Sequence, residues 1–327
     1  MKFGVIIVTY NRLSLLKECI EHCIHQTVPL STICIVDNHS TDGTAEYLDE
    51  VAGPGPVSQK QEFQIFHLPE NMGGAGGFSY GLEHASPCDW VLIIDDDAMI
   101  GEHYIERIQE QIEKNRQKGK KYLAYSGTVM NHGEVEKLHR RRIRNNWFML
   151  YEQVPEKDYH QETFTYDVST FCGLVLKYSL IKKIGLPKTE YFIWFDDTEY
   201  SLRVRRYSRM VNVNGAVLNH KTEQTKDAPP ISWKSYYGFR NAIDIGKKYA
   251  VESSVFQCYI YLNHVAHIII DSLCLLWDWK NRDIRRYRIQ VYTDVIRDSL
   301  NGVMGKNEKY LPGTPQPGNY KDKKKEK

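Results

Sequence analysis

The run Trp90-Val91-Leu92-Ile93-Ile94-Asp95-Asp96-Asp97 joins an uninterrupted apolar segment to three carboxylates. An apolar run without alternation predicts a strand that is buried on both faces, as in a parallel sheet. The carboxylates then lie at the carboxyl end of that strand, where open α/β sheets bind ligands. Clustered carboxylates need a cation, and hard oxygen ligands suit Mg²⁺ or Mn²⁺ bridging a diphosphate. An exposed acidic turn is the alternative.

The chain on the N-terminal side of this run alternates strands with helices. Residues 5–8 (VIIV) and 33–36 (ICIV) are short β-branched runs, and apolar residues between them recur at helical spacing. Residues 63–67 and 122–129 predict further strands, and the charged residues 101–118 predict a helix. This alternation predicts an α/β fold whose parallel sheet is covered by helices on both faces. The helical residues between the first two strands are Leu13, Leu16, Ile20 and Ile24.

The rest of the chain is less regular. Residues 131–166 are polar and aromatic and predict a long functional loop or lid. Within it, residues 139–144 form a basic loop that either contacts a diphosphate or is only solvated. Loops are predicted at Gly53–Pro56 and Lys226–Pro230, and residues 231 to about 300 are helical. We therefore expect a catalytic domain over 1–230, a helical region over 231–310 and a flexible basic tail over 311–327.

Composition limits the class of protein. The chain has 327 residues, of which 26% are charged and 42% hydrophobic, so it is neither a disordered chain nor a mini-protein. Residues 1–230 carry a formal charge of about −5 and residues 231–327 about +7. This asymmetry argues against a nucleic-acid partner and favours an anionic partner, such as a membrane surface, for the C-terminal part. The seven cysteines form no C-x-x-C pair, and no export signal is visible, so we expect a cytoplasmic protein.

Two further motifs precede the triple carboxylate. Asp37 ends the strand 33–36 and could accept a hydrogen bond from a base or a ribose, whereas Ser40–Asp42 are interpreted as helix-capping residues. Asn71–Phe78 is rich in glycine and opens a helix, so its backbone could approach a phosphate or sugar, or could simply pack closely. It matches neither the dinucleotide fingerprint nor the P-loop.

Two more motifs follow the triple carboxylate. Trp194–Tyr200 sets three carboxylates beside aromatic rings, which can pack on sugars while a carboxylate deprotonates a hydroxyl. The same acidic residues could instead complement a helix dipole. His220 follows the predicted strand 211–218 and is either a ligand or a structural histidine.

Taken together, these motifs resemble a family 2 glycosyltransferase with the GT-A fold, a Rossmann-like nucleotide-diphospho-sugar transferase domain, over roughly residues 3–305. The resemblance rests on their order along the chain. Asn71–Phe78 and Asp196–Tyr200 are most similar to bacterial galactofuranosyltransferases, with rhamnosyltransferases next. The motifs, in order, are Val8–Arg12, Val36–Asn38, Asn71–Phe78, Asp95–Asp97, Trp194–Tyr200 and His220.

The resemblance implies a role for each residue. Asp95, Asp97 and His220 would hold Mn²⁺ or Mg²⁺ on the donor diphosphate, and Asp197 would be the catalytic base of an inverting transfer. Trp194, Asp196 and Glu199 would bind sugar. The residues expected to bind the nucleotide or the donor are Thr9, Asn11, Arg12, Asp37, Asn38, Asn71, Gly73, Gly74, Gly77 and Asp96.

The implied reaction moves galactofuranose from UDP-galactofuranose onto a cell-surface polysaccharide or a lipid-linked glycan. A dTDP-rhamnose-dependent rhamnosyltransferase is the alternative. A sugar-nucleotide pyrophosphorylase is disfavoured because Thr9–Arg12 has no glycine for a triphosphate loop. A non-catalytic sugar-binding protein is disfavoured because Asp197 and His220 are both present.

The helical part suggests a further partner. Residues 255–277 are apolar enough to suggest a membrane span, but a polar residue recurs every seven positions at Gln257, His264, Asp271 and Asp278. This pattern predicts an amphipathic helix, packed either on the protein or on a membrane. Five basic residues over 280–288 favour peripheral, salt-sensitive contact with the inner face of the cell membrane. The sequence leaves open whether the protein forms a homo-oligomer.

Overall fold

The structure is a computed structural model that describes residues 1–53, 61–222, 231–314 and 317. Most of the loop predicted at 53–56, the break predicted at 226–230 and most of the tail predicted at 311–327 lie outside these residues. The chain divides into two compact units. The first comprises Met1–Ile143, Tyr151–Thr189 and Asp197–Glu223, and the second Arg144–Leu150, Glu190–Asp196 and Gln224–Lys327.

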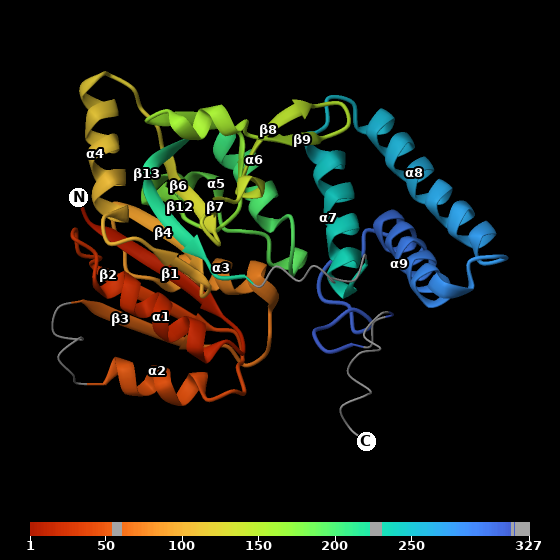
Figure 1. Ribbon diagram of the computed structural model, residues 1–327, viewed down its shortest axis with the longest axis horizontal. Helices are drawn as coiled ribbons and strands as arrows, with labels where there is room; N and C mark the ends of the chain where they lie inside the picture. Colours follow the sequence, from red (N-terminus) through yellow and green to blue (C-terminus); the bar gives the residue numbers. More distant parts are fainter. Residues whose placement is uncertain (54–60, 223–230, 315–316, 318–327) are drawn as a thin grey trace. The chain divides into compact units, whose positions relative to one another are not determined.

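One half of the central sheet in the first unit is parallel (Figure 1). It consists of β1 (Phe3–Thr9), β2 (Thr32–Asp37), β3 (Glu62–His67) and β4 (Trp90–Asp95). β1 lies between β2 and β4, and β3 forms the edge beyond β2. The strands expected from the uninterrupted apolar runs are confirmed.

The other half of the sheet is mixed, so the prediction of a wholly parallel sheet is wrong. β12 (Leu174–Lys177) runs antiparallel to both of its neighbours, β4 and β6 (Ala124–Asn131). An apolar run reports burial on both faces but not strand direction, so the sequence pattern could not reveal this reversal. β13 (Met210–His220) runs parallel to β6. β5 (Ala98–Ile100) and β10 (Thr163–Tyr166) run antiparallel to β13, and β7 (Glu134–Val135) runs antiparallel to β6.

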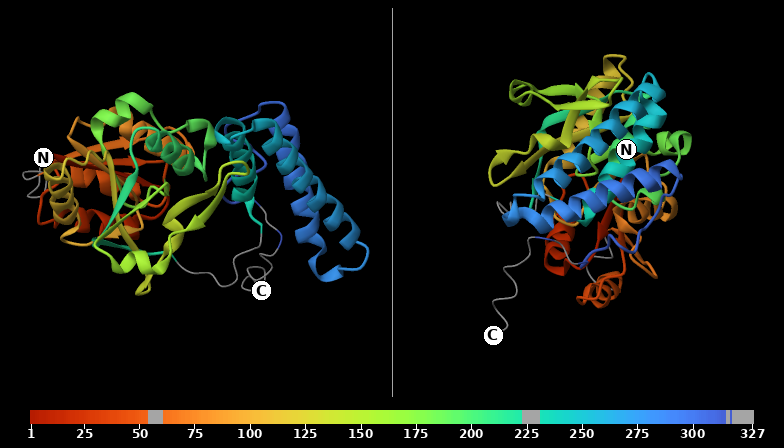
Figure 2. Two further views of the ribbon diagram at one scale, coloured as in Figure 1. Left: turned by 90° about the horizontal axis from the view of Figure 1, so that it is seen from above. Right: turned by 90° about the vertical axis from the view of Figure 1, so that its right-hand side faces the viewer.

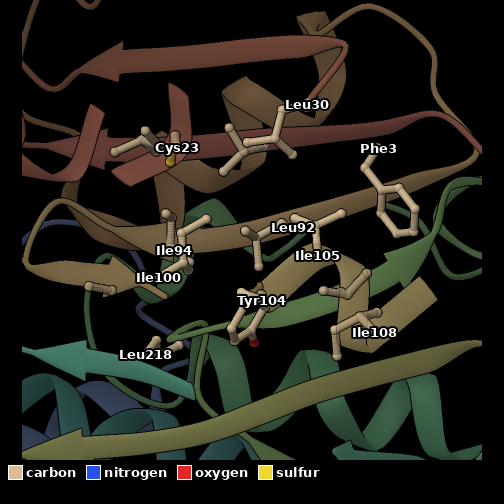
Figure 3. Close-up of a cluster of buried hydrophobic side chains, with 14 of the residues drawn as sticks. Phe3, Cys23, Leu30, Leu92, Ile94, Ile100, Tyr104, Ile105, Ile108 and Leu218 are labelled. Carbon is tan, nitrogen blue, oxygen red and sulfur yellow. The ribbon is translucent and has the colours of Figure 1, made fainter. Parts of the chain in front are cut away.

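Helices cover both faces of the sheet, as predicted. Val5 and Ile7 of β1 pack into one apolar cluster, and Ile6 and Val8 pack into the other, because neighbouring strand residues point to opposite faces. Figure 3 shows part of the first cluster, where α4 meets the sheet. The first cluster includes residues of α1 (Leu13–Ile24), α2 (Thr44–Ala52) and α4 (Tyr104–Gln117); the second includes residues of α3 (Gly73–His84), α5 (Tyr178–Ile184) and α6 (Asp196–Arg205).

Residues 131–166 are regular structure rather than the predicted long loop. Arg140 is fully buried and donates hydrogen bonds to the carbonyls of Gly127 (2.9 Å) and Cys172 (3.0 Å). The prediction of a basic loop over 139–144 is wrong, because residues 140–145 form a strand. The Arg140 guanidinium satisfies buried backbone acceptors. The segments here are β7, the short helices η1 (Lys137–His139) and η2 (Glu156–His160), β10, and β8 (Arg140–Asn145) and β9 (Leu150–Gln153), which pair in a small sheet with β11 (Val168–Ser169).

The second unit is mainly helical, as predicted for residues 231–300. It contains α7 (Trp233–Tyr249), α8 (Ser253–Cys274), the short helix η4 (Trp279–Asn281) and α9 (Arg282–Leu300), and the short helix η3 (Thr189–Tyr191) begins at the junction of the two units. α8 and α9 lie side by side (Figures 1 and 2), and both pack against α7. No helix within the described ranges is long and apolar enough to cross a bilayer.

Candidate active site

The carboxyl ends of three parallel strands bring the predicted residues to one edge of the sheet. Thr9 at the end of β1 is in register with Asp37 of β2, and the preceding Val8 is in register with Asp95 of β4. His220, the last residue of β13, pairs with Ala98 of β5, directly after the three aspartates. Residues separated by more than 200 positions therefore meet at the edge where α/β sheets bind ligands.

The three aspartates have different partners. Asp96 is fully buried, accepts a hydrogen bond from the Thr9 hydroxyl (2.7 Å) and forms an ion pair with Arg12 (2.8 Å). Asp97 also pairs with Arg12, while its Oδ1 lies 3.5 Å from His220 Nε2. Asp95 is partly exposed. The structure thus ties Thr9 and Arg12 to the carboxylate cluster, with Asp96 turned inward.

Burial and mutual repulsion separate the pKa values of these carboxyls. Burial raises the pKa of Asp95 to about 6, and the nearby Asp97 carboxylate adds to this effect. Burial also raises the pKa of Asp96 to about 7, against the opposing effect of Arg12. The pKa of Asp97 is lowered despite burial, because His220 and Arg12 stabilise its charged form. Asp97 is therefore the best anionic ligand of the three at neutral pH.

His220 is held by two carboxylates. Its Nδ1 lies 2.7 Å from Glu136 Oε2, which leaves Nε2 on the side of Asp97. Burial alone would lower the pKa of His220, but the nearby Asp97 and Glu136 carboxylates outweigh it and raise the pKa to about 9. Glu136 also contacts His139 Nε2 at 3.1 Å, and that bond lowers the Glu136 pKa to about 2. Glu136 thus orients the His220 ring.

The donor set fits the predicted divalent metal. Asp95 and Asp97 offer carboxylate oxygens. His220 offers Nε2 once a bound cation displaces its proton, and its opposite nitrogen is already held by a carboxylate, as is common for histidine ligands. Asp97 Oδ1 is buried and accepts no well-aligned hydrogen bond from the described residues. Such oxygen-rich sites suit Mn²⁺ or Mg²⁺.

A second group of metal-binding side chains lies nearby, but it is satisfied without an ion. His139, Cys172 and His220 bring one potential ligand atom each within 4.8 Å of one another. Both ring nitrogens of His139 already bond, to Thr170 (2.7 Å) and Glu136 (3.1 Å). Burial raises the pKa of the Cys172 thiol well above its usual range, so it stays protonated.

The predicted asparagines shape the loops around the site. The Asn38 side chain accepts from the backbone of Met72 (2.8 Å) and donates to the carbonyl of Gly73 (2.9 Å), which joins β2 to the start of α3. Asn71 accepts from the backbone of Gly73 (2.8 Å). Asn11 has a positive φ of 52° and accepts from the backbone of Thr41 (2.7 Å).

Asp37 accepts from the backbone of Ser40 (2.9 Å) and contacts His67 at 3.1 Å.

The glycines of Asn71–Phe78 lie in the first turns of α3. A Cβ on Gly77 would come 2.6 Å from Val8 Cγ1, so the helix packs against β1 at this position. Gly73, at φ 72°, starts the helix, and a Cβ on Gly74 would meet no atom within 4 Å. Close packing accounts for Gly77, whereas Gly74 has open space beside it.

Asp197, the predicted base, sits near the start of α6 with Thr198 and Arg141. The Thr198 backbone and hydroxyl both donate to Asp197, and Arg141 donates to the Thr198 hydroxyl (2.9 Å). Burial raises the pKa of Asp197, while Arg141 acts in the opposite direction. The Asp197 charge also acts on Asp95, so the two carboxyls belong to the same electrostatic cluster. A raised pKa suits a group that must take up a proton.

The remaining predicted sugar-binding residues lie in different settings. Glu199 is buried and pairs with Arg203 (2.8 Å) and Lys188 (3.5 Å). Trp194 and Asp196 belong to the second unit, where Trp194 is 45% exposed, has a positive φ of 64° and packs against Gly238. Asp196 is buried.

Sequence reasoning did not assign Glu136 or Arg141 to the site. Glu136 follows the two-residue strand β7, and nothing in its neighbourhood distinguishes it from a surface glutamate. Arg141 was predicted only as part of a basic loop. The consecutive arginines over residues 140–142 carry no signal in the sequence that separates Arg141 from its neighbours.

Solved structures share the fold of this chain. The structure of GalNAc-T7 with UDP, GalNAc and Mn²⁺ matches 92% of this chain and 57% of that protein, with a TM-score of 0.62 and 14% identity. The TarS structure from S. aureus matches 96% of this chain and 98% of that one, with a TM-score of 0.54 and 15% identity. These similarities establish a GT-A type fold followed by a helical C-terminal region.

Curated relatives match a shorter stretch. The glycosyltransferase GlyG of Streptococcus pneumoniae is 28% identical over 111 residues, 34% of this chain and 35% of GlyG. The poly(ribitol-phosphate) beta-glucosyltransferase of Bacillus spizizenii is 26% identical over 109 residues, 33% of this chain and 16% of that protein. The matched stretch spans about a third or less of the length of these relatives.

The family comparison covers more of the chain. The sequence model of glycosyl transferase family 2 matches residues 4–180. The match includes Thr9, Asp37 and Asp95–Asp97, and it ends before Asp197 and His220. Because it spans more than half of the 327 residues, and because the fold agrees, the chain belongs to glycosyl transferase family 2.

Proposed function

We propose that this protein is an inverting, metal-dependent glycosyltransferase that moves a sugar from a nucleotide-diphosphate donor onto a glycan or lipid-linked glycan. One observation carries the proposal: Thr9, Asp37, Asp95–Asp97 and His220 converge at the carboxyl edge of the sheet. The neighbours solved with UDP and Mn²⁺ or with UDP-GlcNAc support a nucleotide-sugar donor.

Asp197 acts as the base in this mechanism. The acceptor hydroxyl oxygen attacks the anomeric carbon from the side opposite the diphosphate, and the carbon–diphosphate bond breaks. The hydroxyl proton passes to Asp197, whose raised pKa favours uptake. Arg141 and Thr198 hold Asp197 in place.

Asp95, Asp97 and His220 would hold Mn²⁺ or Mg²⁺, which when bound neutralises the charge on the departing diphosphate. Asp96 serves a different purpose, because its bonds to Thr9 and Arg12 fix the turn that presents its neighbours. Asp37 lies at the adjoining strand end, where it can accept from the nucleoside.

The donor we propose is UDP-galactofuranose, and dTDP-rhamnose is the second candidate. The support is the similarity of Asn71–Phe78 and Asp196–Tyr200 to galactofuranosyltransferases. A panel of nucleotide sugars, scored by protection against thermal unfolding with Mn²⁺ and then by turnover, tests this. We expect protection and transfer with UDP-galactofuranose; transfer with dTDP-rhamnose alone would establish the second candidate.

The helical unit is a candidate for binding the acceptor. We propose that this unit contacts the acceptor, the membrane or another subunit, and that the protein works in the cytoplasm at the inner membrane face. The excess of about seven positive charges over residues 231–327 supports an anionic surface as the setting.

A further inference from the structure

Helix α8 buries its polar side and exposes its apolar side. His264 and Asp271 are 4% and 3% exposed, and both lie inside the helical unit. Leu262, Ile269 and Leu273 are 64%, 53% and 52% exposed. A helix that is only packed on its own domain does the reverse. The outward face of α8 is therefore mainly apolar, which is unusual for a helix that packs only on its own domain.

Other α8 residues share this exposed face. They are large and apolar and are distributed over the length of the helix, while the polar Asn263 and Ser272 are also exposed. Asp271 is the only aspartate, glutamate, lysine or arginine in α8, and it faces inward. We call this surface the α8 outer face; it consists of Val255, Tyr259, Leu262, Val265, Ile269, Ile270 and Leu273.

The α8 outer face ends in two tryptophans and basic residues. Beyond the helix, Leu276, Trp277 and Trp279 are 72%, 63% and 74% exposed. Arg285 bonds Asp271 (2.7 Å) and also Asp278, whereas the exposed Asp283 lies 3.9 Å from Arg286. Lys280 and Arg286 remain exposed. Tryptophan beside lysine and arginine is the composition that binds the interface of an anionic bilayer.

We propose that α8 lies in the plane of an anionic lipid bilayer, with the α8 outer face, Trp277 and Trp279 in the headgroup and acyl boundary and with Lys280 and Arg286 at the phosphates. This inference rests on the proposed function, because a bilayer would bring the enzyme to lipid-linked acceptors. It specifies the contact surface and its orientation. No described helix could instead span the bilayer.

A second copy of the chain is the competing occupant of this face. Charge favours the bilayer: the face itself carries no acidic or basic residue that could set the register of a protein partner, and the exposed Lys280 and Arg286 follow its C-terminal end. A face of this composition suits a fluid apolar phase bounded by anionic headgroups.

Leu273→Glu tests the inference in the full-length protein. Leu273 is about half exposed, so a charge there should leave folding intact. Val303→Glu is the matched control, because Val303 lies in the same unit, is 47% exposed and is outside the α8 outer face. Co-sedimentation is measured with vesicles of phosphatidylcholine alone and of phosphatidylcholine mixed with phosphatidylglycerol.

We expect the wild-type protein and Val303→Glu to bind the mixed vesicles and to release in high salt. Leu273→Glu should bind them about tenfold less well or worse. Brominated lipids should quench tryptophan fluorescence in the wild-type protein and in Val303→Glu, and this quenching should weaken in the Trp277→Ala, Trp279→Ala double variant.

Three results overturn the inference: absence of vesicle binding, equal binding by Leu273→Glu, or a dimer that Leu273→Glu dissociates without any vesicle binding. Thermal protection by UDP and Mn²⁺ is recorded on the same samples. Lost vesicle binding with intact protection refutes the membrane face alone. Vesicle binding without protection refutes the proposed function and leaves the membrane face standing.

Discussion

At the scale of single residues, Asp197 combines a position beside the carboxylate cluster with a raised pKa. Asp197→Asn keeps the shape of the side chain but removes the proton acceptor. We expect transfer to fall by about 10²- to 10⁴-fold while donor binding stays near normal. Steady-state transfer assays and titration with UDP measure the two effects. If Asp196→Asn is crippled and Asp197→Asn is fully active, the base assignment is wrong by one residue.

We infer that Glu136 is a positioning residue that acts through His220. Its bond to His220 Nδ1 (2.7 Å) leaves Nε2 available on the side of Asp97. Glu136→Gln should weaken Mn²⁺ binding by about 10- to 100-fold, as loss of such support typically does. Titration calorimetry with Mn²⁺ measures the affinity directly. The exposed Glu134, in the same short strand region, provides the control Glu134→Gln; equal affinities in both variants would contradict the role.

These residues differ in how visible they are in the sequence. The convergence of Asp37, Asp95–Asp97 and His220 could be predicted because each lies at the end of an apolar strand, and strand ends meet at one edge. Glu136 could not, since its role depends on a histidine 84 positions away. The bond between Thr9 and Asp96 likewise appears only once β1 and β4 lie side by side.

At the scale of elements, α3 approaches β1 closely at Gly77. A methyl group on Gly77 would come 2.6 Å from Val8 Cγ1, so Gly77→Ala should destabilise the protein by about 1–3 kcal/mol. Thermal and denaturant unfolding measure this. Adding Val8→Ala should recover part of the loss, because it removes the clashing methyl groups. Additive losses in the double variant would contradict the packing explanation.

Helix α8 carries an acid-sensitive group in its buried side. Burial lowers the pKa of His264 from its ordinary 6.5 to about 4, and neither ring nitrogen has a hydrogen-bond partner among the described residues. The unfolded chain therefore binds the proton first as pH falls. The stabilising contribution of a neutral His264 is complete above pH 6.5 and is lost as pH falls toward 4, by at most about 3 kcal/mol.

His264→Leu should remove this part of the pH dependence of unfolding. The exposed His25 provides the control, and His25→Leu should retain the wild-type slope between pH 6.5 and 4. Denaturant unfolding at several pH values gives the slopes. An unchanged slope in His264→Leu would show that His264 does not titrate abnormally.

Elements were predictable where burial alone defines them. β1, β2 and β4 were found because they are apolar on both faces, whereas the antiparallel direction of β12 leaves no trace in composition. β8 was not predicted because it begins with three arginines, which do not look like a buried strand. One of them, Arg140, is fully buried and donates to backbone carbonyls. For α8 the sequence predicted the amphipathic helix, but not that its polar stripe faces inward.

At the scale of the whole molecule, a family 2 catalytic fold is combined with a helical unit of opposite net charge. We propose that the carboxylate edge of this fold binds a nucleotide diphosphate through a divalent metal. The most direct measurement is titration calorimetry of UDP with Mn²⁺, repeated in excess EDTA and with Asp97→Ala. We expect UDP to bind the wild-type protein in the presence of Mn²⁺, and we expect this binding to be lost in EDTA and in Asp97→Ala. Equal UDP affinity under all three conditions would contradict it.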